Sequence, residues 1–147
     1  MILARSTEYA IRALVFIQVQ NWRKKRPLIS EIAREIEAPE AFTAKVLQAL
    51  AKRGTVKSMK GRGGGFFFDE EAEEVSLYQV INTTEGDKLF HQCGFGLKNC
   101  SNNNPCPLHD RYQEVRDGFY AIVTEETIQS LSKKILEGKA VLNRIEL

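Results

Sequence analysis

Three cysteines that lie close together in the sequence are the residues best suited to chemistry. Six residues separate Cys93 from Cys100, and five separate Cys100 from Cys106. They lie in a stretch rich in Gly, Asn, Ser and Pro, not at the regularly spaced apolar positions of a core helix or strand. Thiolates on a loop suit a soft metal centre. An odd number of cysteines also argues against a framework of disulfides.

His109 places an imidazole three residues after Cys106, which makes a Cys3His ligand set available. The spacing is compatible with an iron–sulfur cluster, with zinc, or with metal-free redox thiols. The gaps between the cysteines are too wide for the paired CxxC motifs of a zinc ribbon. His109 could equally begin a helix without binding metal. The residues therefore predict a metal or redox site and leave its chemistry open.

The segments on either side of the cysteines indicate how such a site is held. Residues 82–107 show no apolar periodicity, which predicts an unusually long loop of the kind that is functional or disordered. A helix is predicted to follow, with an apolar seam formed by Leu108, Tyr112, Val115, Phe119 and Ile122. A second copy of the chain is the simplest partner for this seam, and packing onto the first helix of the same chain is the alternative. Thr124 is expected to cap a final helix that ends at Gly138.

The N-terminal part of the chain is predicted to form a helix-turn-helix. A first helix begins after Ser6 or Thr7, either of which can cap it, and a second begins at Ser30. A third helix follows a turn at 37–39 and spans residues 40–53. Its inner face is expected to hold Phe42, Val46, Leu47 and Leu50, and its outer face Thr43, Lys45 and Gln48. Two helices joined by a three-residue turn are typical of proteins that place the second helix in the major groove of DNA.

A glycine-rich hairpin is expected to follow the third helix. Residues 55–60 alternate as a strand does, and the run at 61–65 contains four glycines, which permit a tight turn with positive φ. A hairpin in this place is a wing. Lys57, Lys60 and Arg62 would then present positive charge to DNA phosphates or to a narrow minor groove. A plain glycine-rich loop is the alternative.

Charge is distributed unevenly along the chain. Residues 1–62 carry 13 Lys and Arg against 5 Asp and Glu, whereas residues 63–147 carry 8 against 14. A basic half joined to an acidic half indicates that the first half contacts nucleic acid. The apolar share is 43%, no stretch is long enough to span a membrane, and no secretory signal is present. We therefore expect a soluble cytoplasmic protein without membrane association.

Four pieces of the sequence form a specific combination. They are residues 6–14 (STEYAIRAL), residues 46–50 (VLQAL), residues 61–65 (GRGGG) and the three-cysteine loop before a long helix. Together they resemble the Rrf-type family of bacterial winged-helix transcriptional regulators, and the resemblance extends over nearly the whole chain. The family includes an iron–sulfur cluster regulator and a nitric-oxide-sensitive repressor.

The resemblance implies that Cys93, Cys100 and Cys106 hold an iron–sulfur cluster, and we expect the two-iron type, with the four-iron type as the alternative. It offers two candidates for a fourth ligand, His109 and Glu8 of the partner subunit. We prefer His109, because it is tied to Cys106 by the sequence and needs no assumption about a dimer.

These observations predict a mainly α fold: a winged helix-turn-helix with a small β-hairpin wing and a long C-terminal dimerisation helix. The expected segments are a DNA-binding domain at 1–82, a cysteine-containing sensor loop at 83–107 and dimerisation helices at 108–147. The predicted function is that of a homodimeric transcriptional regulator, a repressor or an activator, that binds a palindromic operator in double-stranded DNA. It would sense redox, nitric oxide or iron–sulfur status, and no catalytic residues or enzymatic activity are expected.

Two other functions fit parts of the sequence. A cofactor-free or zinc-binding winged-helix protein would bind DNA without sensing. A small redox carrier would explain the cysteines but leave the helix-turn-helix and wing without a purpose.

Overall fold

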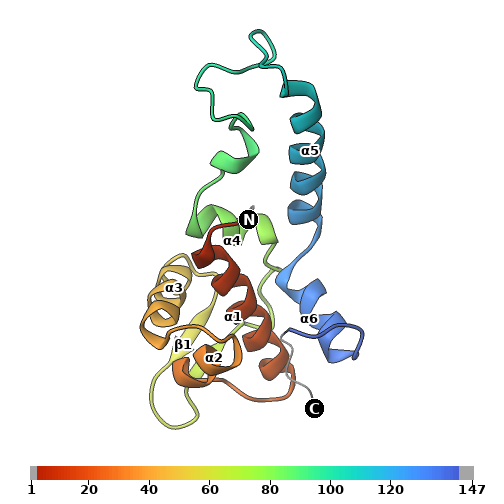
Figure 1. Ribbon diagram of the computed structural model, residues 1–147. Helices are drawn as coiled ribbons and strands as arrows, with labels where there is room; N and C mark the ends of the chain where they lie inside the picture. Colours follow the sequence, from red (N-terminus) through yellow and green to blue (C-terminus); the bar gives the residue numbers. More distant parts are fainter. Residues whose placement is uncertain (1–2, 143–147) are drawn as a thin grey trace.

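The computed structural model describes residues 3–142 and confirms the predicted mainly α, winged-helix fold (Figure 1). In chain order the elements are α1 (Arg5–Trp22), α2 (Ile29–Glu35), α3 (Glu40–Lys52), β1 (Lys57–Met59), β2 (Gly65–Phe67), α4 (Leu77–Thr84), the 3-10 helix η1 (Lys88–Phe90), α5 (His109–Glu125) and α6 (Ile128–Leu136). Residues 1–2 and 143–147 belong to the first and last of the predicted segments and lie outside the described residues.

α1 is the central helix of the core. Its buried side chains recur at three- and four-residue spacing as predicted, at Tyr9, Ala10, Ala13, Leu14 and Ile17. The prediction that Ser6 or Thr7 caps this helix is wrong, because the helix begins at Arg5. Thr7 is buried, and its hydroxyl donates to Glu85 Oε2 at 2.5 Å. The hydroxyl that the local sequence predicted to cap α1 therefore donates instead to Glu85, just beyond the end of α4.

α2 and α3 form the helix-turn-helix, with α2 starting one residue before the predicted Ser30. Two expectations for α3 are wrong: Thr43 is 1% exposed, whereas Phe42 is 37% exposed. The buried face of α3 holds Thr43, Val46, Leu47 and Leu50, which follow the helical period. Residue 42 lies about 100° from residue 43 around the helix. Its ring therefore packs edge-on against Tyr9 at the rim of the core, with centroids 5.4 Å apart.

The wing is an antiparallel pair of strands in which Lys57 lies opposite Phe67 and Met59 lies opposite Gly65. Its first strand is shorter than the predicted 55–60. The Phe66 N–H donates to Pro27 O at 2.9 Å, which ties the wing to the segment between α1 and α2. Gly65 has a φ of 135°, and a Cβ at this position would lie 2.2 Å from Arg26 O. The close approach of the two segments therefore requires glycine.

Two hydroxyl caps define the helices that close the core. Ser76 caps α4 by accepting from Gln79 N at 3.2 Å, and Thr127 caps α6 by accepting from Ser130 N at 2.8 Å. The prediction that Thr124 caps α6 is wrong, because α5 continues to Glu125. α6 then returns along α1.

α5 stands apart from this core, and the segment after α4 runs alongside it to its far end (Figure 1). Of the predicted seam, Phe119 packs on its own chain, where its ring stacks on Phe90 with centroids 5.8 Å apart. Leu108, Val115 and Ile122 are 37%, 57% and 55% exposed. The seam is therefore only partly covered by the chain that carries it. Among residues 3–142, no helix is both long and apolar enough to cross a bilayer.

Candidate metal centre and nucleic-acid interface

The three cysteines converge at the far end of α5, in the segment 91–108 that we call the cysteine loop (Figure 1). The sulfur atoms of Cys93, Cys100 and Cys106 all lie within 4.8 Å of one another, and the Sγ atoms of Cys93 and Cys106 are 3.4 Å apart. All three thiols are free and half-buried. Three soft ligands directed at one small volume can hold a metal ion or a cluster.

Backbone N–H groups are directed at two of these sulfurs. The Phe95 N–H donates to Cys93 Sγ at 3.4 Å, and the Cys106 N–H donates to Cys100 Sγ at 3.3 Å. The N–H groups of Phe95 and Leu97 lower the pKa of the Cys93 thiol to about 7, whereas burial raises the pKa of Cys106. The loop thus stabilises negative charge at Cys93, and the thiolate is the form that binds metal.

His109, the first residue of α5, lies beside the sulfurs. Its side chain is buried, with Nδ1 at 3.3 Å from Cys100 Sγ and Nε2 at 2.9 Å from Asn102 Oδ1. Because an amide oxygen can only accept, the Nε2–H donates to Asn102, and Nδ1 is the nitrogen that faces Cys100. Asn102 is a site residue that sequence reasoning missed. It belongs to a run of three asparagines, and no local pattern tells which of them faces the imidazole.

Glu8 lies away from the sulfurs of its own chain. It is half-buried in the first turn of α1, whereas the cysteine loop lies beyond the far end of α5 (Figure 1). Over residues 3–142, the mutually close set of potential ligand atoms comprises the three cysteines alone. Neither Glu8 nor His109 belongs to that set, although His109 contacts one of its members.

Two of the three α3 residues that were predicted to contact DNA lie on the exposed face of the helix. Lys45 and Gln48 are exposed, as a helix in a groove requires. Thr43 is not available, because its buried hydroxyl donates to Pro39 O at 2.9 Å.

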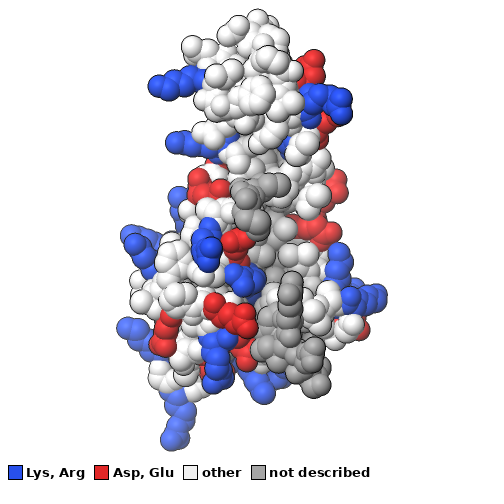
Figure 2. All heavy atoms as spheres, in the orientation of Figure 1, with Lys and Arg blue, Asp and Glu red and all other residues white. Residues whose placement is uncertain are grey.

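The wing presents its three predicted basic residues to solvent. Lys57 forms an ion pair with Asp69. In the part of the chain that is described, no ion pair involves Lys60 or Arg62. Figure 2 shows Lys and Arg side chains projecting around the end that carries the helix-turn-helix and wing, with Asp and Glu between them, whereas the end with the cysteine loop is mainly uncharged on this face. The positive charges of Lys60 and Arg62 at the wing tip are therefore less neutralised than the charge of Lys57.

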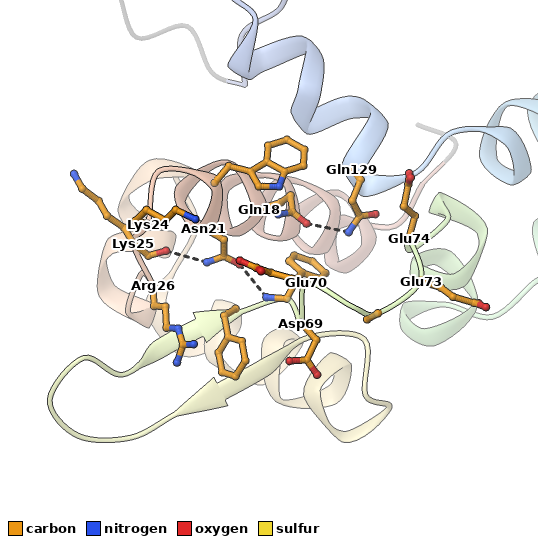
Figure 3. Close-up of a pocket in the computed structure, with 14 residues that line it drawn as sticks. Gln18, Asn21, Lys24, Lys25, Arg26, Asp69, Glu70, Glu73, Glu74 and Gln129 are labelled. Atoms are coloured by element: carbon orange, nitrogen blue, oxygen red, sulfur yellow. Dashed lines mark hydrogen bonds between the residues drawn. The ribbon is translucent and has the colours of Figure 1, made fainter.

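A polar hollow of about 650 Å³ lies at the root of the wing (Figure 3). Asn21 holds its floor together: the side-chain amide donates to Lys25 O at 2.9 Å and Phe66 O at 3.2 Å, and Asn21 Oδ1 accepts from Phe68 N at 2.9 Å. One side chain of α1 thus ties both ends of the segment 66–68 to the helix. No sequence pattern singled out Asn21, because two of its three partners, Phe66 and Phe68, are distant along the chain.

Comparison with known proteins agrees with this arrangement. The chain matches the profile of the Rrf2 family, described as iron-dependent transcriptional regulators, over residues 3–134. The HTH-type transcriptional regulator NsrR of Bacillus subtilis is 27% identical over 134 residues, which cover 90% of this chain and 91% of NsrR.

Two solved structures have the same fold. CymR, the global cysteine regulator of B. subtilis, superposes with a TM-score of 0.72 at 16% identity, covering 89% of this chain and 95% of CymR. IscR of T. potens superposes with a TM-score of 0.70 at 18% identity, covering 95% of this chain and 91% of IscR. The proteins it resembles are regulators and not enzymes, which confirms the expectation of a DNA-binding transcription regulator. The chain belongs to the Rrf2 family of iron-dependent transcriptional regulators.

Proposed function

We propose that this regulator is a homodimer whose binding to a palindromic operator depends on an iron–sulfur cluster held by Cys93, Cys100 and Cys106. The observation that carries the proposal is the convergence of three sulfurs within 4.8 Å at the start of α5. Membership of a family described as iron-dependent supports iron over zinc. A small redox carrier would not account for membership of a family of transcriptional regulators.

The ligands fit an iron–sulfur cluster. Cysteine thiolates are its usual ligands, and N–H groups directed at sulfur, as at Cys93 and Cys100, are among the features that set its reduction potential. When bound, such a cluster supplies a centre that changes its redox state and reacts with oxygen or nitric oxide. We favour the two-iron type and keep the four-iron type as the alternative.

His109 is our preferred fourth ligand. Its Nδ1 faces Cys100, and its Nε2–H is held by Asn102, which is how metal-binding imidazoles are usually oriented. The alternative is Glu8 of the partner subunit. A zinc site or a cofactor-free site would use the same cysteines without a redox signal.

DNA is bound by the basic end of the molecule. We propose that Lys45 and Gln48 of α3 meet base edges or phosphates in the major groove, while Lys60 and Arg62 reach phosphates or the minor groove from the wing. Lys57 contributes less, because Asp69 offsets its charge. A two-fold symmetric dimer requires a two-fold symmetric operator with half-sites on successive turns of the duplex.

A second copy of the chain would cover the exposed apolar side chains of α5. The last residue of the cysteine loop directly precedes His109, so the path of this loop sets where α5 begins. Ordering the loop through its cysteines would therefore change the relative position of the two α5 helices and of the two DNA-binding ends. The predicted division at 1–82, 83–107 and 108–147 assigns these three roles, although α6 of the last segment packs along α1 of the first.

The experiment compares anaerobically purified wild type with Cys106→Ala on one operator at fixed salt. We expect iron and visible absorption in the wild type, and a colourless Cys106→Ala that folds and dimerises but has altered operator affinity. Ser101→Ala, in the same exposed loop, is the matched control and should behave as wild type. Stoichiometric zinc in a colourless wild type would contradict the cluster. Equal affinity of an iron-loaded wild type and Cys106→Ala would contradict its control of DNA binding.

The fourth ligand is tested by a second pair of variants. His109→Ala should make the cluster more labile to oxygen, whereas Glu8→Ala should leave its absorption and lifetime unchanged. The reverse result would assign the fourth position to the partner's Glu8.

A further inference from the structure

The cysteine loop also contains the geometry of a thiol oxidation site. We propose that in the metal-free chain Cys93 and Cys106 form a disulfide on reaction with a peroxide, and that Cys100 stays a thiol. The pairing rests on the sulfur positions in the metal-free chain and does not depend on the proposed function.

The two sulfurs that pair are already in contact. Their separation of 3.4 Å must shorten by about 1.4 Å to reach a disulfide bond of about 2.05 Å. The segment between Cys93 and Cys106 contains no helix and no named strand among the described elements, and it includes two glycines, so a shift of this size does not disrupt a packed element. A hollow of about 440 Å³ is lined by Cys106 and also by Cys100, and it gives a small oxidant access to Cys106, one sulfur of the pair.

Cys100 is held by other groups. Its sulfur is 3.3 Å from His109 Nδ1 and accepts the Cys106 N–H, also at 3.3 Å. Cys93 also accepts an N–H, from Phe95 at 3.4 Å, so the imidazole is what sets Cys100 apart: a bond from Cys100 would have to break its contact with His109, which Cys93 and Cys106 do not make. The sequence alone favours the opposite result, because Cys100 and Cys106 are the closest pair along the chain.

The reaction uses one peroxide for each disulfide. The first thiol attacks hydrogen peroxide, the O–O bond breaks, and a sulfenic acid and one water form. The second sulfur then attacks the sulfenic sulfur; the S–S bond forms, the S–O bond breaks, and the oxygen leaves as a second water. The two sulfurs give up two electrons in total, and the peroxide is reduced to two waters. Either cysteine can be oxidised first, because the other lies in position to resolve it.

The disulfide would exclude metal binding. It consumes two of the three sulfurs, so metal-bound and disulfide forms cannot coexist in one chain. If the proposed function is correct, the regulator therefore has a third state, metal-free and oxidised, that must be reduced by a thiol before iron can be loaded again.

The positions of Lys98 and Arg111 allow a direct test on metal-free full-length protein. Trypsin separates residues 89–98, which contain Cys93, from residues 99–111, which contain the other two cysteines. After one equivalent of peroxide and alkylation, a non-reduced digest should contain these two peptides joined, with Cys100 alkylated. Intact mass should fall by about 2 Da relative to the reduced chain before alkylation.

Three serine variants complete the test. Cys100→Ser should form the disulfide at a rate within about twofold of wild type, whereas Cys93→Ser and Cys106→Ser should lower its yield by about tenfold or more. Circular dichroism checks that each variant retains its helices. A bond within peptide 99–111, a Cys93–Cys100 bond, linkage between two chains, or no disulfide would each overturn the proposal. None of these outcomes bears on the iron content of anaerobic wild type, which tests the proposed function separately.

Discussion

The two ends of this molecule keep their shape in different ways. The winged-helix end buries its large apolar side chains in one core, including Leu14, Ile17, Ile32, Leu47 and Ile81. In α5, by contrast, only His109 and Val123 are buried among the described residues, while Val115 and Ile122 are exposed. The first end is stabilised by its own packing. The second end, with its cysteine loop, leaves apolar side chains exposed and three thiols free. Its conformation can therefore respond to a metal, an oxidant or a second chain.

The same substitution at each end should have very different effects. Leu47 is fully buried in α3, so Leu47→Ala should lower the free energy of unfolding by about 2–5 kcal/mol. Leu97 is 52% exposed in the cysteine loop, and Leu97→Ala should change it by about 0.5 kcal/mol or less. Urea unfolding followed by circular dichroism measures both. Similar losses for the two variants would show that the cysteine loop belongs to the same cooperative core.

An acidic residue in the exposed seam should separate the proposed dimer. Ile122→Asp would place an unpaired charge in the interface and should raise the dimer dissociation constant about 100-fold, or about 3 kcal/mol. Sedimentation at several concentrations provides the measurement. Ala121→Asp, on the neighbouring face of α5, is the control that should stay dimeric. Phe119 is less suitable, because it stacks on Phe90 of its own chain. A full dimer of Ile122→Asp would exclude this seam as the interface.

Loss of Asn21 should loosen the wing more than the helices. Asn21→Ala removes three hydrogen bonds at the root of the wing and should cost about 1–3 kcal/mol of stability. Operator affinity should also fall, because β2 is no longer held against α1. Asn82→Ala, at an exposed position on α4, makes the same chemical change and should have little effect on either. Unchanged operator affinity of Asn21→Ala would mean that the wing is positioned by other contacts.

Within the wing, charge neutralisation by Asp69 should distinguish two basic residues. Arg62→Ala should reduce the slope of log affinity against log salt by about one, the value expected for a lost phosphate contact. Lys57→Ala should reduce it less, because its charge is already paired. Fluorescence titrations of one operator at several salt concentrations measure the slope for each variant. Equal changes in slope would mean that the Lys57–Asp69 pair opens on DNA.

Periodicity predicted the helices of the core well, because the burial of one apolar face is a local property of the sequence. The predictions of helix caps failed, because the hydroxyl side chains had more than one possible hydrogen-bond partner. Thr7 and Thr124 were both expected to cap helices. Thr7 instead bonds to Glu85, and Thr124 donates to Tyr120 O within α5 at 2.8 Å. Local sequence shows that a hydroxyl can cap but not which competing acceptor the fold brings near it.

The sequence by itself determined the helix-turn-helix, the glycine-rich wing and the confinement of three cysteines to one loop, because these depend on spacing over a few residues. Only the tertiary structure decided that the sulfurs approach within 4.8 Å, that Asn102 orients His109, and that Asp69 neutralises Lys57. Each of these contacts depends on the path of a loop or turn. Such a path has no repeating pattern in the sequence, because it is set by backbone contacts between distant segments, such as the one that allows only glycine at position 65.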